Sequence, residues 1–199
     1  AVGYQPYAFW LFQQLYDTNG NVIPGAFVDR NGDGQITNDD RYYVERTPKW
    51  TFGFGFNYNY KNWDFGTSFR GQFGGQTYNS RILTSGWIDA ARPTNSSSLS
   101  NVLDFYSGEA STSFINFNGN EKFSDYMIED ATFLRCENIV LGYRFNKFYK
   151  DASLRLYGAV NNAFLVTKYG GQDPENFGGI DNNFYPRPRV YTVGLSLDF

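Results

Sequence analysis

An aromatic side chain occupies every second position from residue 50 to residue 60, where the sequence reads WTFGFGFNYNY, and only Thr, Gly and Asn lie between the rings. Because successive side chains of a β-strand point to opposite faces, this pattern predicts a strand with rings on one face and almost no bulk on the other. Such a strand is about 36 Å long. When it is tilted by about 45°, the height that it spans is close to that of the apolar band of an outer-membrane barrel, roughly 25 Å. We therefore expect the ring-bearing face to contact lipid hydrocarbon.

The same alternation recurs further along the chain. The segment 63–75 follows residue 60 after only Lys61 and Asn62, which predicts a tight hairpin. A second hairpin is predicted around the short sequence NKFYKD, residues 146–151. The alternating positions on either side of that turn, and those at the end of the chain, are Ile139, Leu141, Tyr143 and Phe145; Leu154, Leu156, Gly158 and Val160; and Tyr191, Val193, Leu195, Leu197 and Phe199.

With a less regular first strand within Tyr4 to Tyr16, the pattern predicts about six strands whose connections alternate between short and long. The long connections are 17–47, 77–131 and 169–188, and the middle one contains the polar, Ser-rich stretch 93–101. Outer-membrane barrels have short periplasmic turns and long outer loops. The sequence therefore predicts an all-β, transmembrane antiparallel barrel in which 77–131 is a long outer loop.

About six strands do not close a barrel, since bacterial single-chain barrels have at least about eight strands and open sheet edges do not occur in hydrocarbon. Either two strands are hidden in the long connections, or residues 1–199 are the C-terminal part of a larger barrel.

Composition excludes several classes of function. The chain has no His, which removes Ser-His-Asp and Cys-His catalysis and the usual His-containing zinc sites, so we expect no enzyme. The net charge of -3, with acidic and basic residues mixed, gives no basic surface for nucleic acid. The single cysteine, Cys136, is expected to be a packing residue.

Residues 29–40, DRNGDGQITNDD, have the spacing of a calcium-binding loop. We call this segment the acidic loop. It places oxygen-bearing groups at positions one, three, five, seven, nine and twelve, with a glycine at six for the sharp turn. Position twelve holds Asp where an EF-hand has Glu, and flanking helices are not evident, so a plain Asp/Asn/Gly turn is the alternative. The predicted ligands are Asp29, Asn31, Asp33, Gln35, Thr37 and Asp40.

Three arginines, Arg70, Arg144 and Arg155, fall on the polar sides of the predicted strands. We expect them to face a water-filled lumen. Their simplest role there is to orient one another and nearby carboxylates.

Several motifs, in order, resemble the C-terminal region of SusC/RagA-type TonB-linked outer-membrane transporters, and the resemblance covers nearly the whole chain. They are DRNGDGQITNDDR, TPKWTFGFGFNYNYKNWDF, SDYMIEDATFLRCENIVLGYRF, LRLYGAVNNAFLVTKYGGQDPE and YPRPRVYTVGLSLDF. The family implies a plugged barrel of about 22 strands, to which this chain contributes about six. No plug domain is visible in residues 1–199, which are expected to be barrel throughout.

The resemblance also implies function and partners. It implies uptake of glycan fragments or peptides across the outer membrane of Bacteroidetes-type bacteria, with a SusD-like surface lipoprotein as lid and energy delivered by TonB through a plug outside this chain. The family's C-terminal strand is read by the barrel-assembly machinery during insertion. By position it matches Tyr191, Val193, Leu195, Leu197 and Phe199.

Two other readings stay open at the level of sequence. One is a small closed outer-membrane barrel with a structural or adhesive role. The other is a soluble, calcium-dependent carbohydrate-binding β-sandwich that uses surface aromatic rings. The soluble reading is disfavoured because the rings would overfill a small barrel and because the opposite face lacks the Lys and Glu usual on soluble surfaces.

Overall fold

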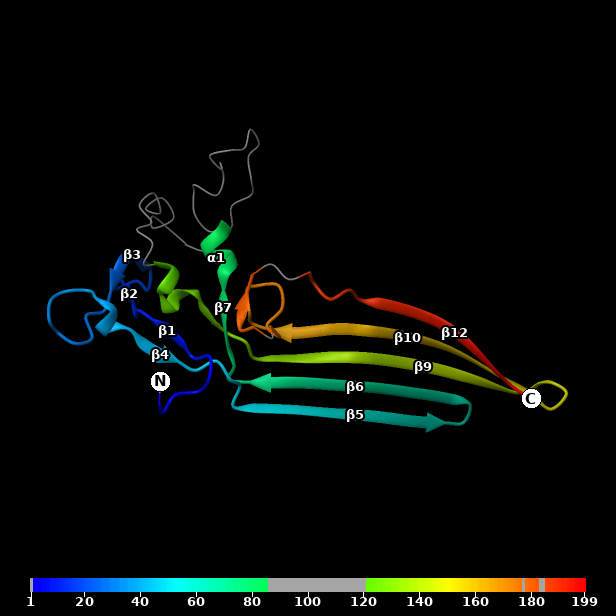
Figure 1. Ribbon diagram of the computed structural model, residues 1–199. Coiled ribbons are helices and arrows are strands. Elements are labelled where there is room, and N and C mark those ends of the chain that lie inside the picture. The colour runs from blue at the N-terminus through cyan, green and yellow to red at the C-terminus, as the bar shows by residue number, and fades with distance from the viewer. Residues whose placement is uncertain (1, 86–120, 177, 183–184) are drawn as a thin grey trace, which may run out of the picture. The chain divides into compact units, whose positions relative to one another are not determined.

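The computed structural model describes residues 2–85, 121–176, 178–182 and 185–199 (Figure 1). The chain divides into two compact units, each built from three segments. The first unit comprises residues 1–47, 75–130 and 169–184, and the second comprises residues 48–74, 131–168 and 185–199.

The second unit is a five-stranded antiparallel sheet with strand order β12-β10-β9-β6-β5. The two-residue turns at 61–62 and 150–151 and the C-terminus lie at one end of this sheet, which we call the hairpin end (Figure 1). Both predicted hairpins are confirmed. The strands are β5 (Trp50–Tyr60), β6 (Trp63–Phe73), β9 (Phe133–Tyr149), β10 (Ala152–Thr167) and β12 (Val190–Asp198).

The register gathers the aromatic and aliphatic positions of all five strands on one face, which we call the ring face. Phe54 is paired with Phe69, and Phe69 is paired with Cys136 of β9. The Phe54 and Phe69 rings stack with centroids 4.9 Å apart, and Phe54 is 54% exposed. We call the opposite side the polar face. The pairing shows that the alternation seen in single strands is continuous across the sheet.

Two bulges interrupt the sheet at one level of β9. The register shifts between Ser68 and Phe69 of β6, which leaves Glu137 of β9 as an extra residue. A second shift lies in β10 after Asn161, where Asn162 has a φ of 52°. Bulges of this kind bend a strand and re-aim side chains. Here the bulges change the direction of two polar side chains, those of Glu137 in β9 and Asn162 in β10.

The sheet differs from the sequence prediction in two places. It contains five strands, because the segment expected as an irregular first strand forms β1 (Phe9–Leu11) and β2 (Gln14–Tyr16), which belong to other sheets. Tyr7 has a φ of 63°, and the segment lacks the sustained alternation shared by the strands of the five-stranded sheet. The predicted turn at 146–151 is also shorter, because β9 continues to Tyr149 through an irregular register.

The first unit collects the long connections into small sheets around a hydrophobic cluster. Val22, Tyr78, Ile82 and Met127 are buried together, with Phe9 packed against them. Its other elements are β3 (Val22–Phe27), β4 (Tyr42–Val44), β7 (Gln76–Asn79), β8 (Ile128–Asp130), β11 (Ile180–Asp181), α1 (Ser80–Ser85) and the 3-10 turns η1 (Asn38–Asp40), η5 (Glu121–Phe123) and η6 (Asp125–Met127). In this unit β1 pairs with β4, β2 with β3, and β7 with both β8 and β11.

The Ser-rich stretch 93–101, within the predicted long outer loop, lies outside the described residues. Across the described part of the chain, no helix has the length and apolarity needed to cross a membrane.

Candidate functional site

The acidic loop is held in a curved shape by its own side chains. The Asp29 carboxylate accepts hydrogen bonds from the backbone N–H groups of Gly32 and Gly34, both at 2.7 Å. Asn31 Oδ1 accepts from the Asp33 N–H at 3.0 Å. Gly32 and Gly34 have φ angles of 76° and 80°, a region that glycine adopts without strain. The first half of the loop is therefore preorganised by the residues predicted as ligands.

Asp40 closes the loop from its far end. Its side chain is fully buried, and Oδ1 accepts from the N–H of Arg30 at 2.8 Å while Oδ2 accepts from the N–H of Thr37 at 2.7 Å. The backbone hydrogen bond from Thr37, followed by those from Arg30 and Asn31, holds the pKa of the Asp40 carboxyl below its usual range. Asp40 therefore ties the two ends of the loop together as a carboxylate.

Side chains at both ends fasten the acidic loop to the rest of the first unit. The Arg30 guanidinium donates to Gln13 Oε1 at 2.9 Å and lies 4.7 Å from the Tyr42 ring centroid. The Tyr42 hydroxyl donates to Asp125 Oδ2 at 2.7 Å. Burial, followed by this hydrogen bond and the Asp125 charge, raises the pKa of Tyr42, so the phenol stays a donor. The loop is thus connected to η6, the 3-10 turn just before β8, through side chains far apart in sequence.

Arg41, which follows the loop, lies among aromatic rings. Its guanidinium carbon is 4.9 Å from the Trp10 centroid, 4.5 Å from Phe12 and 4.2 Å from Phe123. Burial lowers the pKa of Arg41, and the ring faces supply cation–π attraction in place of water.

The oxygen donors of the acidic loop are of the types that a hard cation prefers. The six predicted ligands are not equivalent, because Asp40 is buried and both of its carboxylate oxygens already accept backbone hydrogen bonds. Asp29, Asn31 and Asp33 lie along one hydrogen-bonded turn, and the Gln35 N–H donates to Asp33 Oδ1 at 2.8 Å. No group of three or more His, Cys, Asp or Glu side chains is gathered for a metal within the described residues. Calcium accepts amide, hydroxyl and backbone oxygens as well as carboxylates, so the mixed donor set remains suitable.

The three predicted arginines lie on the polar face of the sheet, each beside a carboxylate. Arg155 of β10 reaches over β9 and binds Asp64 of β6 with two donors, Nε to Oδ1 at 2.8 Å and Nη2 to Oδ2. The pair crosses Gly142, where an added Cβ would lie 2.5 Å from Asp64 Oδ1. Glycine at this position therefore lets the ion pair lie flat against the sheet.

Arg144 and Arg70 have different surroundings. Arg144 Nη1 lies 3.8 Å from Asp198 Oδ2, and both side chains are more than half exposed, so this pair contributes little. Arg70 lies opposite Arg135 in the β6–β9 register, an unfavourable pairing of like charges. Glu137, the bulge residue, accepts a short hydrogen bond from Arg70 Nε and lies 3.9 Å from Arg135 Nε.

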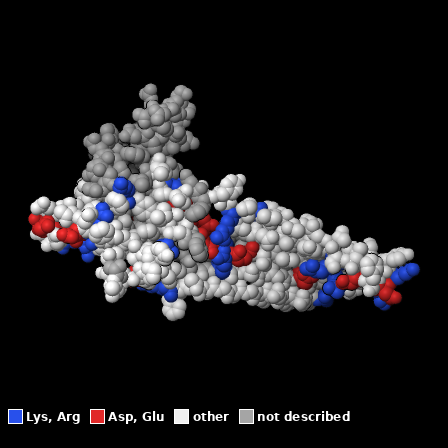
Figure 2. Space-filling model, in the orientation of Figure 1, with Lys and Arg blue, Asp and Glu red and all other residues white. Residues whose placement is uncertain are grey.

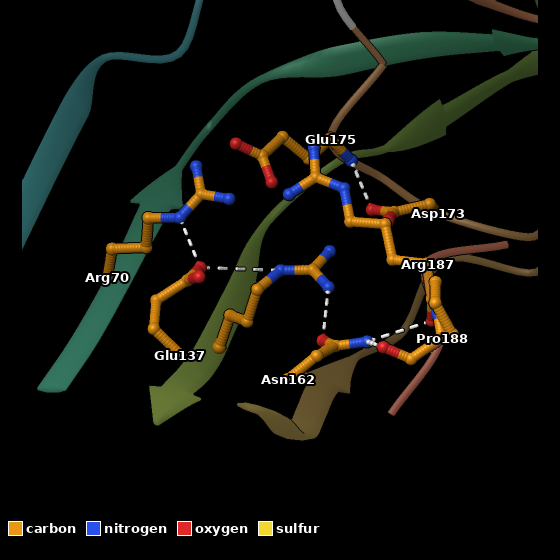
Figure 3. A network of polar contacts seen from close by, with 8 residues as sticks. Arg70, Glu137, Asn162, Asp173, Glu175, Arg187 and Pro188 are labelled. Carbon is orange, nitrogen blue, oxygen red and sulfur yellow. Dashed lines mark hydrogen bonds and ion pairs between the residues drawn. The ribbon is translucent and has the colours of Figure 1, made fainter. Parts of the chain in front are cut away.

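The network around Glu137 continues into β10 through the second bulge (Figure 3). Arg135 Nη1 donates to Asn162 Oδ1 at 2.8 Å, and Asn162 Nδ2 donates to the carbonyls of Arg187 and Pro188 at 2.9 and 3.4 Å. The bulges thus bring β6, β9, β10 and the segment before β12 into one polar cluster. Sequence reasoning did not identify Glu137 or Asn162.

The predicted assembly residues lie along the ring face of β12. Leu195 and Leu197 pair with Leu156 and Leu154 of β10. Val193 is 89% exposed, and Phe199, just beyond the strand, is fully exposed. In the described residues, these side chains are available to lipid or to another protein.

In the view of Figure 2, charged groups gather at the hairpin end and again nearer the other end of the sheet, with uncharged residues between the two groups. A hollow of about 390 Å³ opens at the hairpin end on the polar face, beside Asp64, Arg144 and Arg155. A second hollow of about 520 Å³ continues along the strands over Gly55, Gly66 and other small or amide side chains.

Comparison with known proteins gives consistent results, although no family model matches the chain. The chain is 38% identical over 204 residues to the TonB-dependent receptor SusC of Bacteroides thetaiotaomicron, in an alignment covering 100% of this chain and 20% of that receptor. It is 30% identical over 218 residues to the TonB-dependent receptor P26 of Formosa agariphila, covering 96% and 21%.

Solved structures agree in fold. The RagAB peptide importer in its closed-closed state matches with a TM-score of 0.70 at 24% identity, covering 98% of this chain and 23% of that one. The RagAB peptide transporter matches with a TM-score of 0.65 at 22% identity, again over 98% and 23%. The chain thus spans about a fifth of the length of the curated relatives it matches.

The five-stranded sheet has a continuous ring face and short turns at one end, and outer-membrane receptors match the chain over its whole length. The sheet is therefore part of a transmembrane antiparallel β-barrel of the bacterial outer membrane. The chain belongs to the SusC/RagA type of TonB-dependent receptors and fits their C-terminal region. The predicted fold class, family and location are confirmed.

Proposed function

We propose that this chain forms part of the wall and outer loops of a transporter that imports glycan fragments or peptides across the outer membrane. A SusD-like surface lipoprotein serves as the partner, and TonB supplies energy through a plug outside residues 1–199. The 38% identity to SusC over the whole chain carries this proposal, and the RagAB peptide importer supports the fold. The chain itself performs no chemistry in this function.

The open edges of the sheet support a larger barrel. In the described residues β5 and β12 each pair with one strand only, so each has an unpaired edge. Unpaired backbone groups are not tolerated in hydrocarbon, so we expect further strands, outside the described sheet, to cover both edges. The second unit is also a single sheet, which offers no support for a soluble sandwich or for a small barrel closed by these strands alone.

Import is tested with the full-length protein in its native host. A strain lacking the gene should lose accumulation of a class of labelled oligosaccharides or oligopeptides, and the complemented strain should recover it. The full-length protein purified from membranes should carry a surface lipoprotein with it. Unchanged accumulation of both ligand classes in the deletion strain would reject the proposal.

We also propose that the acidic loop binds calcium as a structural ion, through Asp29, Asn31, Asp33, Gln35 and Thr37, with Asp40 closing the loop. Calorimetric titration of the full-length protein should show binding at about millimolar calcium or below. Asp33→Ala should abolish it, because the central carboxylate of the turn is lost. Asp39→Ala, which changes a neighbouring acid outside the ligand set, should leave it intact; equal titrations of the two variants would remove calcium from this loop.

The C-terminal residues Tyr191, Val193, Leu195, Leu197 and Phe199 are proposed to be the signal read by the barrel-assembly machinery. Deletion of Phe199 should lower the amount of protein in the outer membrane, while the fraction that inserts should unfold normally because this side chain is fully exposed. Membrane fractionation and heat-modifiable gel migration measure the two quantities. Phe199→Tyr should insert at normal levels, and normal levels of the truncated protein would contradict the assignment.

A further inference from the structure

The ring face changes in chemistry toward the hairpin end of the sheet. Along β5 its rings are Phe in the middle of the strand and Tyr58 and Tyr60 at the hairpin end. Trp63 of β6 and Tyr143 of β9 lie next to them, with ring centroids 4.8 Å apart. Tyr and Trp have an apolar body and a polar tip, and they favour the boundary between hydrocarbon and water. The hairpin end of the ring face therefore lies at the level of the lipid headgroups.

Three lysines at this end have an uncommon backbone conformation. Five non-glycine residues in the described part of the chain have a positive φ, and three of them are Lys61, Lys147 and Lys150, with φ of 56°, 55° and 54°. Gly, Asn and Asp adopt this conformation more readily than Lys, so turn geometry alone does not favour lysine here. The two turns that carry them are neighbours, because Asn146 Nδ2 donates to Asn62 Oδ1 at 3.3 Å. The lysines thus form one basic group, which we call the turn lysines.

Two of the turn lysines lie over rings on the lipid side of the sheet. Each directly follows a tyrosine: the Lys61 ammonium lies 5.2 Å from the ring centroid of Tyr60, and the Lys150 ammonium lies 5.5 Å from that of Tyr149. Tyr60 continues the ring face of β5, and Tyr149 pairs with Ala152, a ring-face position of β10. A ring face holds the ammonium without accepting its hydrogen bonds, so the N–H donors stay available.

The nearby carboxylates do not neutralise the turn lysines. In the described ranges, none of the three lysines forms an ion pair. Asp64 and Asp198 are paired with Arg155 and Arg144 on the polar face. Asp151 is the other acid beside the turns, and it is exposed. The ring-face side of the hairpin end therefore has a surplus of positive charge at headgroup level.

We propose that the turn lysines bind the phosphate of an anionic phospholipid in the periplasmic leaflet, while its acyl chains lie on the ring face. Short turns of outer-membrane barrels lie on the periplasmic side, which places the group in that leaflet. Lysine binds phosphate as a point charge, and each lysine near an anionic lipid surface adds to the attraction. The inference goes beyond the proposed function, because it depends on the orientation of the sheet in the membrane and not on what is imported.

The test is photo-labelling of the full-length protein in phosphatidylcholine liposomes. The liposomes contain a trace of phosphatidylglycerol with a diazirine near its glycerol backbone, or the matched phosphatidylcholine. Mass spectrometry, after digestion with a protease that does not cut at lysine, measures the label on residues 58–63 and 143–151. We expect the phosphatidylglycerol label to exceed the phosphatidylcholine label by about fivefold or more, the factor contributed by one lysine near an anionic surface.

Variants separate a binding site from general attraction to negative charge. Changing the three turn lysines to Gln should remove the excess and leave the phosphatidylcholine label unchanged, which also shows that the variant is inserted. Changing them to Arg should retain the excess. Lys49→Gln removes one exposed positive charge at the other end of β5 and should have no effect, whereas Lys61→Gln alone should lower the excess.

Three results would overturn the proposal. The first is equal labelling by the two lipids in the unchanged protein, and the second is an excess that survives the triple Gln variant. The third is a reduction by Lys49→Gln as large as that by Lys61→Gln, which would indicate only diffuse electrostatic attraction. Soluble glycerol phosphate should not compete at the concentration of the labelled lipid, because it lacks the acyl chains that contact the ring face; competition would mean a site for a soluble anion instead.

Discussion

Replacing Phe54 by Arg is expected to destabilise the inserted protein by about 2 to 4 kcal/mol, the cost of a cationic side chain on the lipid face near the middle of the bilayer. Phe54 lies at the middle of β5 on the ring face and stacks on Phe69 at 4.9 Å. The substitution removes that stacking and places a guanidinium in hydrocarbon. Urea unfolding of the full-length protein reconstituted in liposomes, followed by heat-modifiable gel migration, measures the change.

The matched variant is Asn57→Arg on the same strand. Asn57 is exposed on the polar face, beside Gly66, so the new arginine extends into water and should change stability little. If the two variants lose equal stability, or if Asn57→Arg loses more, the ring face is not the lipid face. This comparison tests the orientation of the whole sheet, because the register makes the two faces continuous across all five strands.

The sheet was predictable because period-two alternation is a local signal. From Trp50 to Tyr60, the polarity of each residue indicates which face of the strand it occupies. The two-residue gap at Lys61 and Asn62 then sets the register of the hairpin. The first bulge also leaves a signal that single-strand reading overlooked. Ring-face residues are even-numbered at Leu134 and Cys136 but odd-numbered from Ile139 onward, so the phase changes at the extra residue Glu137.

The first unit was not predictable in the same way, because its strands are too short to show a period. β1, β2 and β4 have three residues each, and their positions depend on contacts distant in sequence. Buried Gln14, for example, receives a hydrogen bond from Ser124 Oγ at 2.9 Å and donates to Ile23 and Ala26 carbonyls. No local pattern encodes a bond between residues 110 positions apart.

The predicted site residues show a similar division. The acidic loop was found because its spacing is a local motif, and the structure adds that Asp40 is buried and engaged by backbone N–H groups. The partners of Arg70 and Arg155 were not predictable individually. Glu137 and Asp64 meet them only through strand pairing, and Gly142 makes room for one of these contacts.

A second large effect is expected at Gly71 of β6, where Ala should destabilise the sheet by about 1 to 3 kcal/mol, the usual cost of overpacking. A Cβ there would lie 2.6 Å from the backbone oxygen of Phe133 and 2.6 Å from Phe52 Cζ. The Phe52 ring lies over the glycine and is partly buried, unlike the exposed rings further along β5. Relief of the clash requires both a new Phe52 rotamer and a shift of the β6–β9 ladder.

The control is Gly158→Ala, also on the ring face, where an added Cβ meets nothing within 4 Å. This variant should be neutral or slightly stabilising, because Ala reduces the freedom of the unfolded chain. The same liposome unfolding assay compares the two glycines, and Phe52→Leu combined with Gly71→Ala should recover part of the loss by removing the ring. If the double variant is as unstable as Gly71→Ala alone, the loss of stability comes from the contact with the Phe133 carbonyl. If Gly71→Ala and Gly158→Ala have equal stability, Phe52 does not pack closely on the sheet.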